Sequence, residues 1–316
     1  MELNQAVLQL DAAAEPSRLR LLVALLGGET SVGDLVAVLE QSQPRVSRHL
    51  RLLTEAGLVE SFREGRSIFY RWSARGLDAG VASSVAAVAA SPDPTIARDR
   101  ERLQKLSRQR ERDALRRALR AGRGRGLRVA DGDTTLADLL HATLADRAGG
   151  GPFSAGSMPL GAILNVGCGS GEVLRLLLPE ARLAVGTEPS GHRRQLARAR
   201  LREAALPRWS IRDAEPARLP FEADAFDLVI LQDVLSPARN DELQSILADA
   251  ARVLRPAGRL LILDHILPTD SEVATRLGAL GFDVIRRQWL PGRAPDRALF
   301  LASRPVLAPA RTGTHD

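Results

Sequence analysis

The stretch AILNVGCGSGEVLRLLL, residues 162–178, constrains the fold of this chain more than any other part of the sequence. An apolar run ends at Val166, glycines follow at alternate positions, and a helical pattern begins directly after them. Glycines at such a point allow the backbone to turn tightly and to approach a ligand. The next apolar run ends at Glu188, where an acid can accept hydrogen bonds from ribose hydroxyl groups. Strand, glycine loop, helix, strand and acid in this order predict a nucleotide-binding α/β unit.

Short apolar runs alternate with helical patterns from residue 162 onward. The runs are AILNV, LAVGTE, FDLVILQ, RLLILD, FDVIRRQWL and RALFLAS. This alternation predicts a mostly parallel sheet with helices on both faces. At 316 residues the chain is long enough for two domains and a linker. Its aromatic content is only 3%, so we expect cores built from aliphatic residues and alanine.

The N-terminal part of the chain follows a different pattern, of helices and then a hairpin. Apolar residues recur at helical spacing over 16–28. Ser31 is expected to cap a short helix, and Ser42 is expected to cap the next one, which ends near Gly57. The stretch LVESFREGRSIFYRWS then predicts two strands around a turn at 64–65.

The helix over 42–57 has an apolar stripe of Val46, Leu50 and Leu53, which we expect to be buried. Its polar side then faces outward, as a helix that enters the major groove requires. Arginine can form two bonds to guanine, and glutamine can pair with adenine. The residues predicted to contact DNA are Gln43, Arg45, Ser47, Arg48, His49 and Arg51 in this helix and Arg63, Arg66 and Arg71 in the hairpin.

Two alternatives to DNA contact stay open. The arginines could simply solvate a protein surface, and His49 could equally be a packed or surface histidine. The net charge of the chain is +6, which fits a polyanionic partner. The formal charge of residues 1–76 is zero, so the basic character is local to the proposed contact face.

Residues 11–90 resemble the winged helix-turn-helix domain of the ArsR/SmtB repressor family. The resemblance lies in the pieces AEPSRLRLL, SQPRVSRHLRLLTEAGLV and REGRSIFYRW. It implies a homodimer on double-stranded operator DNA, with 1–14 and 77–90 as dimer helices. Metal sensors of the family carry two cysteines where this chain has Ser31 and Gly33, and segment 77–90 offers one aspartate and no histidine. We therefore expect no metal site.

Residues 162–304 resemble the class I S-adenosylmethionine-dependent methyltransferases, which implies a Rossmann-like fold with a mostly parallel seven-stranded sheet. The resemblance rests on the GxGxG loop together with RDAEPARLPF, FDLVILQDVL and ARVLRPAGRLLILD. It implies that the glycines approach the methionyl and ribose parts, that Glu188 binds ribose, that Asp213 and Ala214 contact adenine, and that Gln232 lies near the methyl group. The residues assigned to S-adenosylmethionine or S-adenosylhomocysteine are Asn165, Gly167, Cys168, Gly169, Gly171, Glu188, Pro189, Asp213, Ala214 and Gln232.

The sequence departs from this family at two points and assigns no catalytic residue. Asn165 replaces a common aspartate, and Ala257 interrupts the usual Pro-Gly-Gly. Three residues, Asp233, Asp264 and His265, could act as acids or bases, but each could equally be a surface or supporting group. The single cysteine, Cys168, excludes a disulfide within the chain; it could be a reactive thiol or a small packed residue. The connection after Asp264 is short, with little room for a lid over a methyl acceptor.

We therefore divide the chain into a DNA-binding and dimerisation domain, 1–90, an arginine-rich helical linker, 91–161, a methyltransferase-like domain, 162–304, and a tail, 305–316. We favour a regulator whose second domain binds S-adenosylmethionine or S-adenosylhomocysteine as its effector. One alternative is an active methyltransferase of a small molecule or protein, and another is a scaffold that binds nothing. No apolar run approaches the length of a membrane span, and the N-terminus lacks a basic start followed by an apolar core, so we expect a cytoplasmic protein.

Overall fold

The computed structural model describes residues 3–73, 80–120, 140, 144, 160–204, 208–265, 270–290 and 297–305. The chain forms two compact units. Unit 1 comprises Met1–Val129, Cys168–Pro179 and Leu183–Asp213, and unit 2 comprises Ala130–Gly167, Glu180–Arg182 and Ala214–Asp316. Unit 1 therefore combines the N-terminal part of the chain with the glycine loop from Cys168 onward and the segments that follow it.

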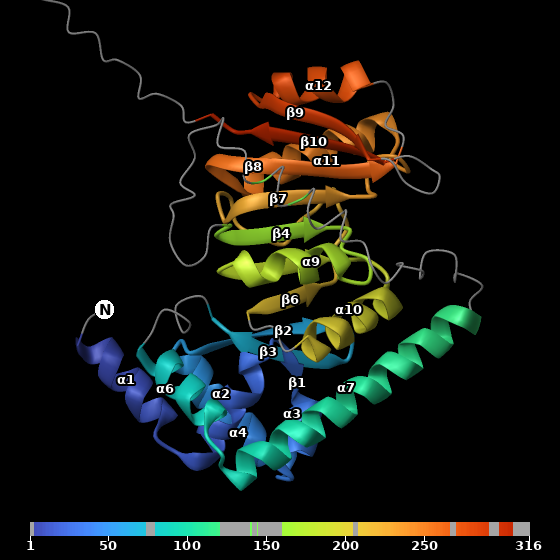
Figure 1. The fold of residues 1–316 in the computed structure, drawn as a ribbon. Helices are drawn as coiled ribbons and strands as arrows, with labels where there is room; N and C mark the ends of the chain where they lie inside the picture. The colour runs from blue at the N-terminus through green and yellow to red at the C-terminus, as the bar shows by residue number, and fades with distance from the viewer. Residues whose placement is uncertain are drawn as a thin grey trace, which may run out of the picture. The chain divides into compact units, whose positions relative to one another are not determined.

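The N-terminal part of unit 1 is a winged helix-turn-helix domain (Figure 1). Its elements are α1 (Leu3–Ala13), α2 (Pro16–Leu26), β1 (Thr30–Ser31), α3 (Val32–Leu39), α4 (Gln43–Glu55), β2 (Val59–Glu64) and β3 (Ser67–Trp72). The three strands form an antiparallel sheet in the order β1-β3-β2. The predicted helices and hairpin are confirmed, and β1 is an additional short strand.

The two predicted helix caps differ in the structure. The Ser31 side chain accepts a hydrogen bond from the Asp34 amide at 3.2 Å, so the cap on α3 is confirmed. Ser42 occupies the predicted N-cap position of α4, but its side chain makes no capping hydrogen bond. One of the first-turn residues is Pro44, which has no amide hydrogen to donate.

A single apolar core holds the winged helix together. The predicted stripe of α4, Val46, Leu50 and Leu53, is fully buried within it. The indole nitrogen of Trp72 donates to the Leu22 carbonyl at 3.0 Å and thereby fixes β3 to α2. The hairpin is therefore attached to the helices by both packing and a buried hydrogen bond.

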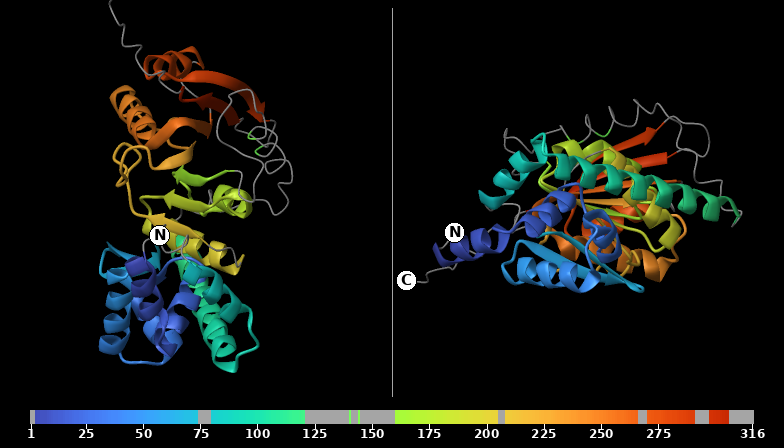
Figure 2. Two further views of the ribbon diagram at one scale, coloured as in Figure 1. Left: turned by 90° about the vertical axis from the view of Figure 1, so that its left-hand side faces the viewer. Right: turned by 90° about the horizontal axis from the view of Figure 1, so that it is seen from below.

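Two further helices follow the hairpin, α6 (Gly80–Ala90) and α7 (Pro94–Arg120). The view from below in Figure 2 shows how far α7 extends. This helix, expected from the arginine-rich segment, packs against α2, α3 and α10 of unit 1. Arg20 of α2 forms a bidentate ion pair with Asp99 of α7 at 2.6 and 2.8 Å, which fixes the start of α7 to the winged helix. The glycine-rich joints predicted at 122–126 and 149–161 lie almost entirely outside the described residues.

The remaining strands form a seven-stranded sheet in the order β6-β5-β4-β7-β8-β10-β9. Pairs β5·β6, β4·β7 and β7·β8 are parallel, and β10 runs antiparallel to both of its neighbours. This confirms the mostly parallel, Rossmann-like sheet. The strands are β4 (Ala162–Val166), β5 (Leu183–Thr187), β6 (Trp209–Arg212), β7 (Phe226–Gln232), β8 (Leu254–His265), β9 (Asp283–Leu290) and β10 (Arg297–Ser303).

The helices of this α/β domain belong to different units. Helices α9 (Glu172–Leu177) and α10 (Gly191–Glu203) lie in unit 1, whereas α11 (Asn240–Val253) and α12 (Asp270–Ala279) lie in unit 2. Within unit 2, α11 packs on β8 and α12 packs on β9, and the two helices touch each other. None of the described helices is long and apolar enough to span a membrane.

Candidate functional site

The outer face of α4 carries the predicted DNA-contacting side chains. Gln43, Arg45, Arg48 and Arg51 are exposed, and Ser47 is partly exposed. Arg51 lies 3.6 Å from Glu55 one turn later, but both side chains are well exposed, so this pair restrains Arg51 only weakly. The arrangement leaves several hydrogen-bond donors on one helix face, which is suited to the major groove.

His49 is oriented differently from its neighbours on α4. Its side chain is only 13% exposed, and Nδ1 lies 3.7 Å from a carboxylate oxygen of Glu15, the N-cap residue of α2. Burial lowers the pKa of the His49 ring, against the opposing attraction of Glu15. The geometry favours the packed alternative for this residue.

The turn of the hairpin presents two of its three arginines. Arg63 and Arg66 are exposed on either side of Gly65, which has a φ of +57°. Arg71 instead pairs with Glu60 of the neighbouring strand at 2.6 Å, and only 14% of its side chain is exposed. Arg71 therefore braces the hairpin and offers little surface to DNA.

The glycine loop is held to the acid at the end of β5. Buried Glu188 accepts a hydrogen bond from the Gly169 amide at 3.2 Å through one carboxylate oxygen and from the Ser190 amide at 2.9 Å through the other. Gly169 has a φ of +54°, and a methyl group built on it would meet no atom within 4 Å. The space at Gly169 is open, as close approach of a ligand requires. Gly171 follows as the N-cap of α9, with a φ of +85°.

Cys168 is packed within unit 1. Its side chain is buried, and burial raises the pKa of the thiol, so the nucleophilic thiolate is disfavoured. Its amide donates to the Thr187 carbonyl at 2.9 Å. Of the two alternatives from sequence, the structure favours the small packed residue.

The residues predicted for adenine begin at the end of β6. The Asp213 side chain is 54% exposed, and its Oδ2 accepts a hydrogen bond from Arg194 of α10 at 2.8 Å. The same guanidinium donates to the Glu188 carbonyl at 2.6 Å and to the Pro189 carbonyl at 2.7 Å. Arg194 thus joins three of the residues that the sequence assigned to the cofactor.

The cofactor residues of unit 2 form a second group. The buried Asn165 amide nitrogen donates to Gln232 Oε1 at 3.0 Å, and the Asn165 Oδ1 atom is buried with no hydrogen-bond partner among the described residues. Gly167 has a φ of +76°, and a methyl group there would lie 2.4 Å from the Gln232 carbonyl oxygen. Ala214 is half-buried. A buried acceptor without a partner needs a hydrogen-bond donor. These residues therefore fit a ligand that carries an amino group.

Asp264, one of the candidate acid–base residues, is fully buried in a structural role. It accepts hydrogen bonds from the Leu235 amide at 2.7 Å, from the Ser236 amide at 3.3 Å and from the Ser236 hydroxyl. Asp264 therefore holds the loop after β7. Asp233 adopts a φ of +52° in that same loop, and the His265 side chain lies outside the described residues.

Sequence reasoning missed a set of buried ion pairs in unit 1. Arg194 and Arg198 of α10 are buried and bind Glu64, and Arg198 also binds Glu29 at 2.5 Å. The partners are more than a hundred residues apart, so no local pattern connects them. The spacing of Arg194, Arg198 and Arg202 at intervals of four was the available signal, because it aligns them on one helix face.

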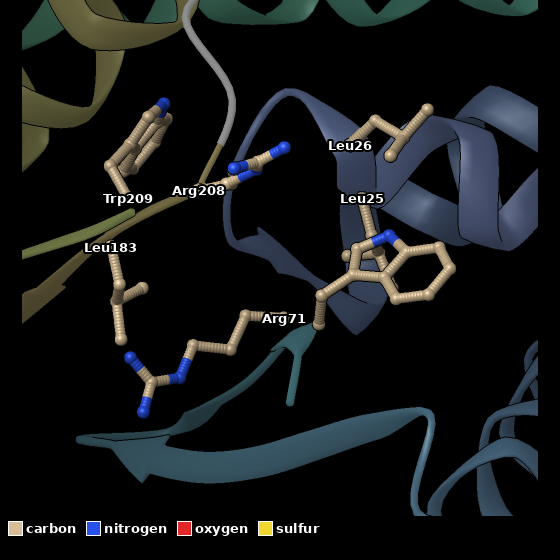
Figure 3. A pocket seen from close by; sticks show the side chains of 8 residues that line it. Leu25, Leu26, Arg71, Leu183, Arg208 and Trp209 are labelled. Carbon is tan, nitrogen blue, oxygen red and sulfur yellow. The ribbon is translucent and has the colours of Figure 1, made fainter. Parts of the chain in front are cut away.

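A small pocket in unit 1 is lined by side chains from α2, β3, β5 and β6 (Figure 3). Figure 3 shows Leu25 and Leu26 of α2, Arg71 of β3, Leu183 of β5, and Arg208 and Trp209 around it. Its volume is about 10 Å³, which leaves room for about one water molecule. It is too small to be a ligand site.

Both parts of the chain match known families. Residues 15–61 match the model described as "Bacterial regulatory protein, arsR family", and residues 164–262 match that of a "Methyltransferase domain". The biofilm growth-associated repressor of Agrobacterium fabrum is 44% identical over 68 residues, which are 22% of this chain and 58% of that protein. The transcriptional activator HlyU of Vibrio cholerae is 44% identical over 75 residues, which are 23% of this chain and 69% of that protein.

The second part resembles methyltransferases in sequence. The demethylmenaquinone methyltransferase of Tropheryma whipplei is 31% identical over 106 residues, 34% of this chain and 42% of that protein. A solved structure of magnesium protoporphyrin IX methyltransferase from Synechocystis, with bound S-adenosylmethionine, superposes with a TM-score of 0.47 at 19% identity, covering 57% of this chain and 88% of that one.

These matches define a regulator-type DNA-binding domain joined to a methyltransferase-type domain. The chain belongs to the ArsR family through its winged helix-turn-helix, and a methyltransferase domain is fused to it.

Proposed function

We propose that this protein is a DNA-binding transcriptional regulator that binds double-stranded operator DNA and takes S-adenosylmethionine or S-adenosylhomocysteine as its effector. The predicted DNA contacts lie on α4 and at the hairpin turn. The predicted effector contacts lie on the glycine loop, on Glu188 and on the residues around Asp213.

One observation carries the effector role. The winged helix belongs to the same compact unit as two segments that carry predicted effector contacts, Cys168–Pro179 and Leu183–Asp213. These segments contain Gly169, Glu188 and Asp213. A ligand can change DNA affinity only if it interacts differently with the two DNA-binding states. Packing of both sets of residues into one unit supplies a physical route for such a difference.

The position of Ser31 supports a signal other than a metal. In metal sensors of the family a cysteine stands here, whereas in this protein the Ser31 hydroxyl caps α3 and donates to Asp34 Oδ2 at 2.8 Å. Gly33 has no side chain that could act as a ligand. Ser31 therefore serves the scaffold of α3.

We also propose a homodimer. Leu3, Val7 and Leu10 recur on one face of α1, and each is more than half exposed, up to 78% for Leu3. An apolar stripe of this kind on a terminal helix suits a contact with a second copy. Sedimentation analysis should give a dimer, and Val7→Glu should shift it to a monomer.

The test of effector binding is calorimetric titration of the full chain with S-adenosylmethionine and with S-adenosylhomocysteine. Gly169→Asp serves as the matched variant, because a Cβ at this position would meet no atom within 4 Å and the added carboxylate would compete with the ligand for this open space. We expect the parent to bind at least one of the two forms and the variant to bind neither. A parent that binds neither form contradicts the proposal.

The alternative of an active methyltransferase rests on the similarity to demethylmenaquinone methyltransferase. Methyl transfer depends mainly on alignment and desolvation of the reactants, so the buried role of Asp264 leaves it open. An effector-controlled regulator and an enzyme without an effector role differ in how the cofactor affects DNA binding. An enzyme without an effector role would bind operator DNA equally well with and without the cofactor.

A further inference from the structure

Three arginines form a row on one face of α10. Arg194, Arg198 and Arg202 follow one another at intervals of four, and each bonds to the winged helix: Arg194 to Glu64, Arg198 to Glu29 and Glu64, and Arg202 to the Glu29 carbonyl at 2.6 Å. Arg194 and Arg198 are each 5% exposed. Buried charges of this kind are stable only when their partners remain in place.

The wing, β2 and β3 with their turn, is anchored by Glu64, the last residue of β2. The Glu64 side chain is 13% exposed and accepts bonds from Arg194 Nε at 2.9 Å and from Arg198 Nη1 at 3.1 Å. Burial alone would raise the pKa of Glu64, but the hydrogen bonds and charges of Arg198 and Arg194 hold that pKa below its ordinary value. Glu64 is therefore a charged anchor between two guanidinium groups.

Two aromatic side chains add to this attachment. The Arg212 guanidinium lies 3.3 Å from the ring centre of Phe62, and that of Arg198 lies 4.3 Å from the ring centre of Phe69. The two rings stack on each other with centres 5.5 Å apart. The wing thus packs on α10 and β6, with exposed Arg63 and Arg66 at its turn.

Arg194 connects this anchored wing to the predicted cofactor residues. Its Nε binds Glu64, its Nη1 binds the carbonyl oxygens of Glu188 and Pro189, and its Nη2 binds Asp213 Oδ2. A guanidinium group is planar and rigid, so its partners cannot shift independently without breaking a bond. Among the described residues, Arg194 binds one oxygen of the half-exposed Asp213, and the other oxygen can accept a bond from an amino group of a ligand.

We propose that Arg194 is a positioning residue shared by the cofactor site and the wing, so that Glu64 of the wing supports binding of S-adenosylhomocysteine without touching it. Arg194 orients Asp213 and the backbone at 188–189, and Glu64 fixes Arg194. Reciprocally, a bound ligand stabilises the anchored position of the wing. This inference rests on the proposed effector site and names the route of its regulation.

The test compares the affinity of the full chain for S-adenosylhomocysteine in Glu64→Gln and Glu60→Gln. Glu60 lies on the same strand and pairs with Arg71 inside the hairpin, so it is a matched control. We expect Glu64→Gln to weaken the affinity by about fivefold or more, the low end of typical couplings between sites, and Glu60→Gln to match the parent. If Glu64→Gln does not fold, as judged by circular dichroism, Glu64→Asp gives the same comparison with a shorter carboxylate.

A double-mutant cycle with Arg194→Lys identifies the route. Lysine keeps the charge but cannot bond all of these partners at once, so Glu64→Gln should weaken binding little further in that background. If the parent and Glu64→Gln bind the ligand with equal affinity, the inference is overturned but the effector site is not. Additive losses of affinity in the double-mutant cycle have the same consequence. A parent that does not bind S-adenosylhomocysteine refutes the proposed site and this inference together.

Discussion

Gly167 and Gly169 lie two residues apart in the glycine loop, and both adopt positive φ angles, +76° and +54°. Their surroundings differ. A methyl group at Gly167 would lie 2.4 Å from the Gln232 carbonyl oxygen and 2.5 Å from Val234, whereas one at Gly169 would meet nothing within 4 Å. The first glycine is required by packing, and the second leaves space for a ligand.

We therefore expect Gly167→Ala to destabilise the protein more than Gly169→Ala does. Both changes strain the backbone, but only the first forces a clash, which adds about 1–3 kcal/mol to the loss in free energy of unfolding. Urea unfolding of the two variants measures the difference. Equal losses would mean that the loop around Gly167 can relax away from Gln232.

His49 gives a pH dependence with a defined sign. Burial is the main cause that lowers its pKa in the folded state below the ordinary value of 6.5, so the neutral ring is favoured there. The contribution of the neutral His49 ring to the free energy of unfolding is fully present above pH 6.5 and is lost as the pH falls through the lower pKa of the folded state. The denaturation midpoint should therefore fall on acidification, and less steeply in His49→Gln. If the denaturation midpoint falls equally with pH in the parent and in His49→Gln, His49 does not cause the loss of stability.

At the residue scale, the sequence located the loop glycines and Glu188 but not Arg194 or Glu64. Glycines and an acid at fixed spacing after strands form a local pattern. Arg194 is one of several arginines in GHRRQLARARLRE, and its partner Glu64 lies 130 residues earlier. Tertiary packing alone distinguishes it from the others.

At the element scale, α4 is the most direct example of a helix that its sequence predicts. A stripe of three aliphatic residues at helical spacing defines the buried side, and the opposite side carries Arg45 and Arg48. By contrast, β1 is two residues long and exists only because Thr30 and Ser31 pair with Tyr70 and Phe69 of β3. A strand this short has no periodicity to detect.

We expect Arg45→Ala and Arg48→Ala each to weaken binding to a preferred DNA sequence by about 1–3 kcal/mol if the side chain contacts a base. The duplex is one that the purified protein selects from a random pool, and the salt concentration is held constant. Arg175→Ala on α9 removes an exposed arginine away from the winged helix and should have little effect. Unchanged affinity in both α4 variants would exclude this helix from base recognition.

At the scale of the whole molecule, the chain combines two family domains, and residues of both lie in unit 1. The sequence predicted both folds, because each has local motifs in a fixed order. It placed α7 in a linker segment, and the structure packs α7 against α2, α3 and α10. Contacts between distant segments decide such packing, and a pattern along the chain does not contain them.

We propose that the methyltransferase-like domain controls DNA binding through its ligand. The most direct measurement is fluorescence anisotropy of the selected duplex, titrated with the full chain at constant salt in the absence and in the presence of saturating S-adenosylhomocysteine. We expect the ligand to change the dissociation constant for DNA by about fivefold or more, and we expect Gly169→Asp to abolish this change while DNA binding itself persists. An identical dissociation constant under both conditions, with calorimetry showing that the ligand is bound, would contradict it.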